Sequence, residues 1–211
     1  MKELEQQYTF AQWLLQDEWL CNECLAHLRP DPRLLRLDEL KLTAFYHYDA
    51  FMEQLLFQFK EGRDTALAPV FFSQVMARLI RQYRGWSWVL MPSSAKRRIE
   101  RGFTPLRRML EGCGKVLYEP FYKSEDHKQS AMSRHQRARI CEIMKRKQEY
   151  PLPSGRVLLL DDVCTTGSTL KHACQLLKKH TLKVEAVTLC AHPLLFETMV
   201  QPLQHIEEGG E

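Results

Sequence analysis

Long apolar runs are missing from this chain of 211 residues. No stretch approaches the roughly 18 consecutive apolar residues that identify a membrane-spanning helix. Residues 1–7 are charged and polar, and they lack the basic-then-apolar order of a secretory signal peptide. Internal repeats are missing as well, which excludes repeat architectures. We therefore expect a soluble, cytoplasmic protein without membrane insertion.

The cysteines lack the pattern of a disulfide-stabilised protein. Seven are present, an odd number, and their spacing is irregular. Cys141, Cys174 and Cys190 occupy apolar positions of expected helices or strands, which predicts buried thiols. The chain has a single Cys-x-x-Cys pair, Cys21 and Cys24. Because a structural zinc site takes four protein ligands, this pair predicts at most an incomplete zinc site, to which nearby His27 is an alternative third ligand.

Two glycine-rich phosphate motifs are also missing. Neither G-x-x-x-x-G-K-[ST] nor G-x-G-x-x-G after a strand occurs, which argues against P-loop and Rossmann dinucleotide sites.

The formal net charge of +4 is modest and does not by itself indicate a nucleic-acid partner. The distribution of the charge is more informative, because basic residues gather in two segments. Each segment is interpreted either as a solvated helix face or as a surface that binds phosphate groups. The first basic cluster comprises Lys96, Arg97, Arg98, Arg101, Arg107 and Arg108, and the second comprises Lys123, Lys128, Arg134, Arg137, Arg139, Lys145, Arg146 and Lys147.

A hydrophobic content of 45% is enough for one substantial core. From about residue 40, short β-rich runs alternate with amphipathic helices, which predicts an α/β fold with a mostly parallel twisted sheet flanked by helices. We expect a small N-terminal appendage at 1–36, the main domain at 37–200 and a C-terminal tail at 201–211. Strands are expected at 44–48, 86–91, 116–118, 157–160 and 184–190, and helices at about 50–59, 65–83, 105–110, 133–147 and 170–177.

The clearest unit begins with Val157–Leu160, a run that is apolar on both faces, as in a central parallel strand. Such a strand delivers Asp161 and Asp162 to the carboxyl edge of the sheet, where ligands bind in open α/β folds. A hydroxyl-rich loop with one glycine then opens a helix, whose amides and dipole favour a phosphate. The predicted loop residues are Thr165, Thr166, Gly167, Ser168 and Thr169.

Adjacent carboxylates beside an anion site suit a ligand that offers hydrogen-bond donors. A ribose 5-phosphate unit does so, with Asp161 and Asp162 on its 2- and 3-hydroxyls and the loop on its phosphate. The alternative is an acidic strand end followed by an ordinary helix cap.

Residues 157–169 resemble the phosphoribosyl pyrophosphate signature of type I phosphoribosyltransferases, although Cys164 stands where a larger apolar or aromatic residue is common. Within that superfamily, the order of several segments across about 45–190 is similar to the ComF family of late-competence proteins. After an N-terminal cysteine pair come Phe59-Lys60-Glu61-Gly62, Met91-Pro92-Ser93-Ser94, Arg101-Gly102-Phe103, Lys128-Gln129-Ser130 and Arg137, and then the signature.

The resemblance implies a type I phosphoribosyltransferase-like fold and roles for further residues. A loop at 123–139 would close over the site, and Mg²⁺ would bridge pyrophosphate and ribose oxygens. Two departures from the family are Thr104-Pro105, where Asn-Gln is usual, and the single cysteine pair. The implied pyrophosphate loop comprises Pro92, Ser93 and Ser94, with Lys96, Arg98 and Arg101 near it.

Three functions fit these observations. The first is a competence protein that binds phosphoribosyl pyrophosphate with Mg²⁺ and acts in DNA uptake, with single-stranded DNA and the DNA-uptake helicase as partners. The second is an active phosphoribosyltransferase, in the glycosyltransferase class, although no acceptor-recognition element is legible. The third is a non-catalytic sugar-phosphate-sensing regulator. Aromatic residues near the basic clusters would either line a groove that binds single-stranded DNA or belong to the core. They are Phe103, Tyr118, Phe121 and Tyr122.

Overall fold

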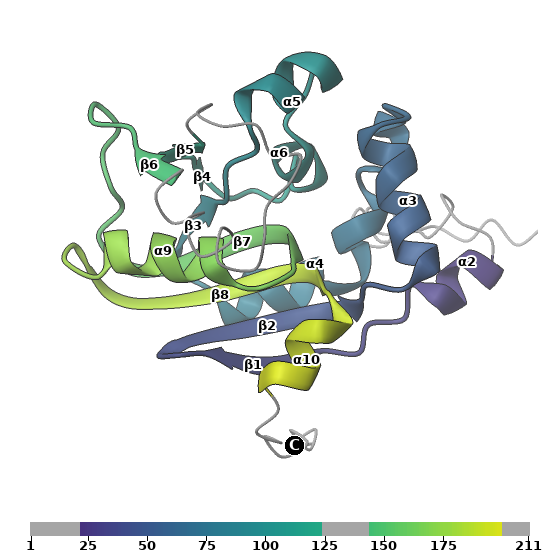
Figure 1. Cartoon of the computed structure of the whole chain (residues 1–211), viewed down its shortest axis with the longest axis horizontal. Coiled ribbons are helices and arrows are strands. Elements are labelled where there is room, and N and C mark those ends of the chain that lie inside the picture. Colours follow the sequence, from purple (N-terminus) through teal and green to yellow (C-terminus); the bar gives the residue numbers. More distant parts are fainter. Residues whose placement is uncertain (1–21, 124–143, 200–211) are drawn as a thin grey trace, which may run out of the picture.

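The computed structural model of the chain describes residues 22–123 and 144–199 (Figure 1). Its centre is a six-stranded sheet of order β1-β2-β8-β7-β3-β4. All neighbouring strands pair in parallel except β1 and β2, which are antiparallel. The predicted α/β fold with a mostly parallel sheet is confirmed. The strands are β1 Arg33–Leu37, β2 Leu40–His47, β3 Ser87–Leu90, β4 Leu117–Tyr118, β7 Gly155–Cys164 and β8 Thr181–Ala191.

Helices cover both faces of the sheet, with α9 on one side and α4 on the other (Figure 1). A separate two-stranded antiparallel sheet pairs β5, Phe121–Lys123, with β6, Met144–Arg146. None of the described helices is long and apolar enough to cross a bilayer. The helices are α2 Asn22–His27, α3 Ala50–Lys60, the 3₁₀ turn Thr65–Leu67, α4 Val70–Gln82, α5 Ala95–Arg101, α6 Pro105–Met109, α9 Ser168–Leu177 and α10 Pro193–Met199.

Strand β7 divides the core because its side chains alternate between the two faces of the sheet. Leu158 and Leu160 pack with α3, α4 and α6, whereas Val157 and Leu159 pack with α9 and the β5–β6 pair. All four side chains are fully buried. The central strand predicted from their apolar run is therefore confirmed, and it extends beyond the predicted end as far as Cys164.

One predicted element is wrong in its described part. The helix expected at 133–147 is strand β6 where it is described, at 144–146, and residues 133–143 lie outside the described part of the chain. The reason is tertiary: Met144 is buried in the same core cluster as Phe121, and β6 pairs with β5. Pairing and burial therefore override the helical spacing of the basic residues.

The elements β1, α2, α5, β5 and α10 are not among those expected from the sequence pattern. Strand β1 crosses residue 36, where the appendage was expected to end, and forms the edge of the main sheet. The division into three segments remains a prediction.

The turn between β7 and α9 requires a glycine for two reasons. Gly167 has a φ of 73°, in the left-handed region that L side chains rarely adopt. In addition, a Cβ atom at this position would lie 2.6 Å from Cδ1 of Leu37 in β1. The signature loop therefore packs directly against the edge strand of the sheet.

We predict that Gly167→Ala lowers the free energy of unfolding by more than the roughly 1–2 kcal/mol that a left-handed backbone costs. The excess comes from the contact with Leu37. Urea denaturation should be compared with Gly155→Ala, since Gly155 has a φ of 79° but a Cβ atom there would meet no atom of the described residues within 4 Å. Equal losses in the two variants would contradict a steric role for Leu37.

Candidate functional site

A cavity of about 460 Å³ lies where the carboxyl ends of β3 and β7 meet the ends of α3 and α5. It brings together residues from the predicted signature and from the implied pyrophosphate loop. The predicted residues that line it are Asp161, Asp162, Thr165, Thr169, Pro92, Ser93, Ser94 and Arg101. Those outside its lining are Thr166, Gly167, Ser168, Lys96 and Arg98, of which Arg98 lines a neighbouring cavity of about 130 Å³.

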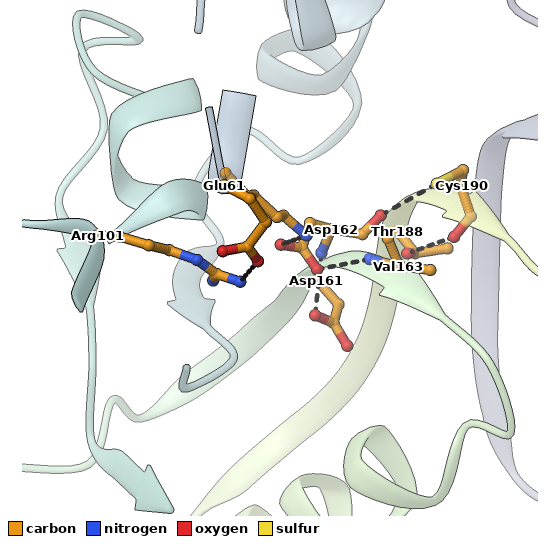
Figure 2. Close-up of polar contacts among 8 residues, drawn as sticks. Glu61, Arg101, Asp161, Asp162, Val163, Thr188 and Cys190 are labelled. Atoms are coloured by element: carbon orange, nitrogen blue, oxygen red, sulfur yellow. Dashed lines mark hydrogen bonds and ion pairs between the residues drawn. The ribbon is translucent and has the colours of Figure 1, made fainter. Parts of the chain in front are cut away.

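The acidic pair is fixed by the backbone that follows it. The amide of Asp162 donates to Oδ1 of Asp161 at 2.9 Å, and the amide of Val163 donates to Oδ1 of Asp162 at 2.8 Å. Strand β8 braces the same segment, because the thiol of Cys190 donates to the carbonyl oxygen of Asp162 at 3.5 Å. Figure 2 shows these contacts side by side. The two carboxylates are therefore held at the end of β7 rather than free to rotate.

Lys60, the last residue of α3, supplies the counter-charge. Its Nζ lies 2.6 Å from Oδ2 of Asp162, and the two side chains are only 16% and 20% exposed. Although burial alone would raise it, the pKa of Asp162 is held below its usual range by the charge of Lys60 and the hydrogen bond from it. Asp162 is therefore ionised at neutral pH.

Asp161 has the opposite environment. Burial, and next the negative charge of Asp162, raise the pKa of Asp161 to about 7, and Lys123 offsets only part of this effect. The pair thus takes up a proton near neutral pH, on the carboxyl group that lacks the lysine partner.

The signature loop combines hydroxyl groups with a helix N-terminus. The hydroxyls of Thr166 and Ser168 lie 2.9 Å apart, and the amide of Ser168 donates to Oγ1 of Thr166 at 3.4 Å. Thr165 and Thr169 line the cavity instead. Since α9 begins at Ser168, the positive end of its dipole lies beside the cavity wall, which favours an anion there.

The opposite wall is built by the segment after β3. Ser94 caps α5 by accepting a hydrogen bond from the amide of Arg97 at 3.3 Å, and it forms a bridge with Lys123 of β5. Arg101 at the end of α5 has a side chain that is only 7% exposed, and its Nη2 donates to Oε1 of Glu61 at 2.5 Å. Cationic groups therefore line the side of the cavity that faces the acidic pair.

Lys60 and Glu61 belong to a segment that carries the family resemblance, but the sequence alone predicts no individual role for either at the site. Two such segments, residues 59–62 and 101–103, contact each other. The rings of Phe59 and Phe103 lie 5.2 Å apart, and Glu61 pairs with Arg101. The separate motifs therefore form one unit, which only the fold reveals.

Position 62, in the first of these segments, requires a glycine. A Cβ atom there would lie 2.5 Å from the carbonyl oxygen of Gln58. The chain can therefore turn sharply after α3, directly behind Lys60 and Glu61.

Two predicted features fall partly or wholly outside the described residues. Cys21 and the loop at 124–139 lie outside them, whereas Cys24 lies in α2. His27 stacks on Phe51, with ring centroids 4.7 Å apart. Within residues 22–123 and 144–199, no group of three or more His, Cys, Asp or Glu residues is arranged to hold a metal ion. The zinc site remains a prediction.

Ion pairs reduce the free charge of the first basic cluster. Arg107 pairs with Glu119, Arg108 with Glu111, and Lys96 with Glu100. Arg97 and Arg98 are exposed, and the described residues place no acidic side chain in an ion pair with either. Among the nearby aromatic residues, Phe121 is buried in the core on the α9 side of the sheet, and Phe103 packs against the core on the opposite side. Tyr118 is partly buried and Tyr122 is 40% exposed.

Three comparisons with known proteins bear on this site. Residues 122–194 match the family described as phosphoribosyl transferase domain. The competence protein ComFC of Bacillus subtilis is 28% identical over 148 residues, which are 68% of this chain and 61% of that protein. The competence protein ComFC of Streptococcus pneumoniae is 26% identical over 136 residues, which are 64% of this chain and 61% of that protein. The match thus spans about three fifths of each relative's length.

Solved structures of phosphoribosyltransferases are also similar. An adenine phosphoribosyltransferase matches with a TM-score of 0.44 and 13% identity, over 89% of this chain and 92% of that one. The adenine phosphoribosyltransferase of Saccharomyces cerevisiae matches with a TM-score of 0.44 and 12% identity, over 86% and 96%.

The phosphoribosyl transferase domain match covers the acidic pair, the signature loop and helix α9, which together form one strand-loop-helix unit. The chain is therefore similar to the ComFC competence proteins, and residues 122–194 match the phosphoribosyl transferase domain family, a combination consistent with the ComF family of the phosphoribosyltransferase superfamily.

Proposed function

We propose that this chain binds phosphoribosyl pyrophosphate together with Mg²⁺ and acts in natural competence. The observation that carries the proposal is the placement of an acidic pair, a hydroxyl-rich helix N-terminus and a nearly buried arginine around one cavity. Asp161 and Asp162 would accept hydrogen bonds from the 2- and 3-hydroxyls of the ribose, and residues 165–169 would hold its 5-phosphate.

The pyrophosphate group would lie on the opposite wall, where Ser93, Ser94 and Arg101 line the cavity. Mg²⁺, when bound with the ligand, would neutralise pyrophosphate charge. The residues fit a metal carried by the ligand's own oxygens, because Asp162 is already paired with Lys60 and the described residues offer no cage of three or more metal ligands. The protein's part is to position the sugar and to balance charge.

The competence role rests on the two relatives named as competence protein ComFC. Single-stranded DNA and the DNA-uptake helicase are the partners we propose with it. Arg97 and Arg98 offer the better surface for DNA phosphates, because both are exposed whereas Arg107 and Arg108 are engaged by glutamates.

A transfer reaction is a second candidate, since the cavity continues along α3 past the residues assigned to the sugar phosphate. Tyr48, Glu53 and Phe57 line that extension, and Phe57 is 65% exposed. An acceptor would bind there, and C1 of the ribose would exchange pyrophosphate for it. Assaying pyrophosphate release against a panel of acceptors tests this candidate, and release that is independent of any acceptor would count against it.

We predict that changing both carboxylates, Asp161→Asn with Asp162→Asn, weakens binding of phosphoribosyl pyrophosphate by several kcal/mol. The reason is that hydrogen bonds to charged groups contribute roughly 1.5–3 kcal/mol each. Calorimetry in the presence of Mg²⁺ measures the change. Asp38→Asn is the matched control, because Asp38 is an exposed acid outside the cavity that pairs with Lys171. Unchanged affinity in the double variant would exclude the acidic pair from the ligand site.

The raised pKa of Asp161 also predicts a stability cost at neutral pH. A carboxyl group whose pKa rises from 3.8 when unfolded to about 7 when folded binds its proton more tightly in the folded state. Its contribution to stability is therefore complete below pH 3.8 and is lost as pH rises to about 7. The stability of Asp161→Asn relative to the unmodified protein should thus rise between pH 4 and pH 7, by on the order of 4 kcal/mol, because each pKa unit of the shift corresponds to about 1.4 kcal/mol.

Urea denaturation at several pH values measures this gain. Asp162→Asn should have the opposite effect at pH 7, because it leaves Lys60 without its partner in a site where both side chains are mostly buried. A gain for Asp161→Asn that does not vary with pH would show that the proton on Asp161 is not its source.

For DNA, we predict that the affinity for single strands falls with salt at about 0.7 per phosphate neutralised in a log–log plot. Replacing Arg97 and Arg98 with alanine should flatten this slope more than replacing Arg107 and Arg108. A flat salt response in the unmodified protein would limit the competence role to protein partners.

A further inference from the structure

The guanidinium group of Arg101 is only half used by the protein. Its Nη2 donates to Oε1 of Glu61 at 2.5 Å. Its Nε is buried and has no hydrogen-bond partner among the described residues. The side chain is 7% exposed and lines the cavity beside the acidic pair. Figure 2 shows Arg101 and Glu61 extending toward each other above Asp161.

Nε and Nη2 belong to the same edge of the guanidinium fork. That edge can donate two parallel hydrogen bonds to two oxygens of one anion, which is the geometry that makes arginine suited to phosphate. Glu61 supplies a single oxygen to it, so one buried N–H remains unsatisfied at a cost of roughly 1–3 kcal/mol. A phosphate group, with several oxygens, matches the complete edge better than Glu61 does.

The two partners differ in how freely they can move. Arg101 is held at the end of α5 by its burial, and neighbouring Phe103 packs against Phe59. The side chain of Glu61, by contrast, is 48% exposed and lies at the C-terminal end of α3. Glu61 can therefore turn toward solvent while Arg101 stays in place.

Glu61 carries its charge at neutral pH. The hydrogen bond from Arg101 lowers the pKa of Glu61, and the charges of Arg97 and Lys60 act in the same direction. The site thus contains an anion of its own beside the arginine edge where a ligand phosphate would bind.

We propose that Glu61 is an internal competitor for the anion site at Arg101, so that a phosphate group of the ligand takes both Nε and Nη2 and turns Glu61 out toward solvent. The inference rests on the proposed function, because it assigns Arg101 to the pyrophosphate end of that ligand. In this proposal Glu61 weakens ligand binding. The affinity is then set in part at the C-terminal end of α3 and not by the signature loop alone. Release of pyrophosphate is favoured by the same exchange, since Glu61 returns to Nη2 as the phosphate leaves.

The test is a calorimetric titration of Glu61→Gln with inorganic pyrophosphate and with phosphoribosyl pyrophosphate. Glutamine keeps the shape and one acceptor oxygen but removes the competing charge. We expect both ligands to bind about two to five times more tightly than to the unmodified protein, the range expected from removing a partly exposed ion pair. Glu100→Gln is the matched control, because it removes the same charge one residue from Arg101 but outside the cavity, and it should leave both affinities unchanged.

The gain should vanish in an Arg101→Lys background, because lysine lacks the planar edge for which the two anions compete. Thermal melting of each variant checks that it is folded. Unchanged or weaker binding by Glu61→Gln, with phosphoribosyl pyrophosphate still bound by the unmodified protein, overturns this inference alone. Tighter pyrophosphate binding without any phosphoribosyl pyrophosphate binding supports the inference and overturns the proposed function. Binding of neither ligand to any variant overturns both.

Discussion

The repulsion between two adjacent carboxylates at the end of β7 is the constraint on which the site depends. Backbone amides hold the carboxylates of Asp161 and Asp162, and both side chains are partly buried. The two carboxylates therefore cannot move away from each other to lower the repulsion. Lys60 pairs with the carboxylate of Asp162, and the carboxyl group of Asp161 takes up a proton near neutral pH. The ion pair requires the end of α3 to lie against the end of β7. The negative charge of the acidic pair therefore constrains the position of α3.

The same helix end connects the acidic wall to the cationic wall. Lys60 reaches Asp162 and Glu61 reaches Arg101, so consecutive residues contact opposite sides of the cavity. Behind them, the aromatic contact of Phe59 with Phe103 fixes the distance between α3 and the end of α5. A motion of α3 would therefore alter both walls at once, which couples the acidic side of the cavity to its cationic side.

The sequence predicted the parts of this arrangement that are local. An apolar run buried on both faces, two acids and a hydroxyl-rich loop follow one another along the chain, and so the strand, the turn and the helix could be read in order. Lys60 and Glu61 could not be assigned, because their partners lie about 100 and 40 residues away and depend on how α3 packs. The helix predicted at residues 144–146 was wrong for a similar reason, because the burial of Met144 against a strand distant in sequence determines their conformation.

The contact between Gly167 and Leu37 ties the signature loop to a strand that is far away in sequence. Any larger residue at position 167 needs a smaller one at position 37, in addition to the cost of its left-handed backbone. Among homologues, these two positions should therefore co-vary, although one belongs to a recognised motif and the other to an edge strand that no motif includes. A change in the packing of the sheet edge would then alter the geometry of the signature loop without any substitution in the loop itself.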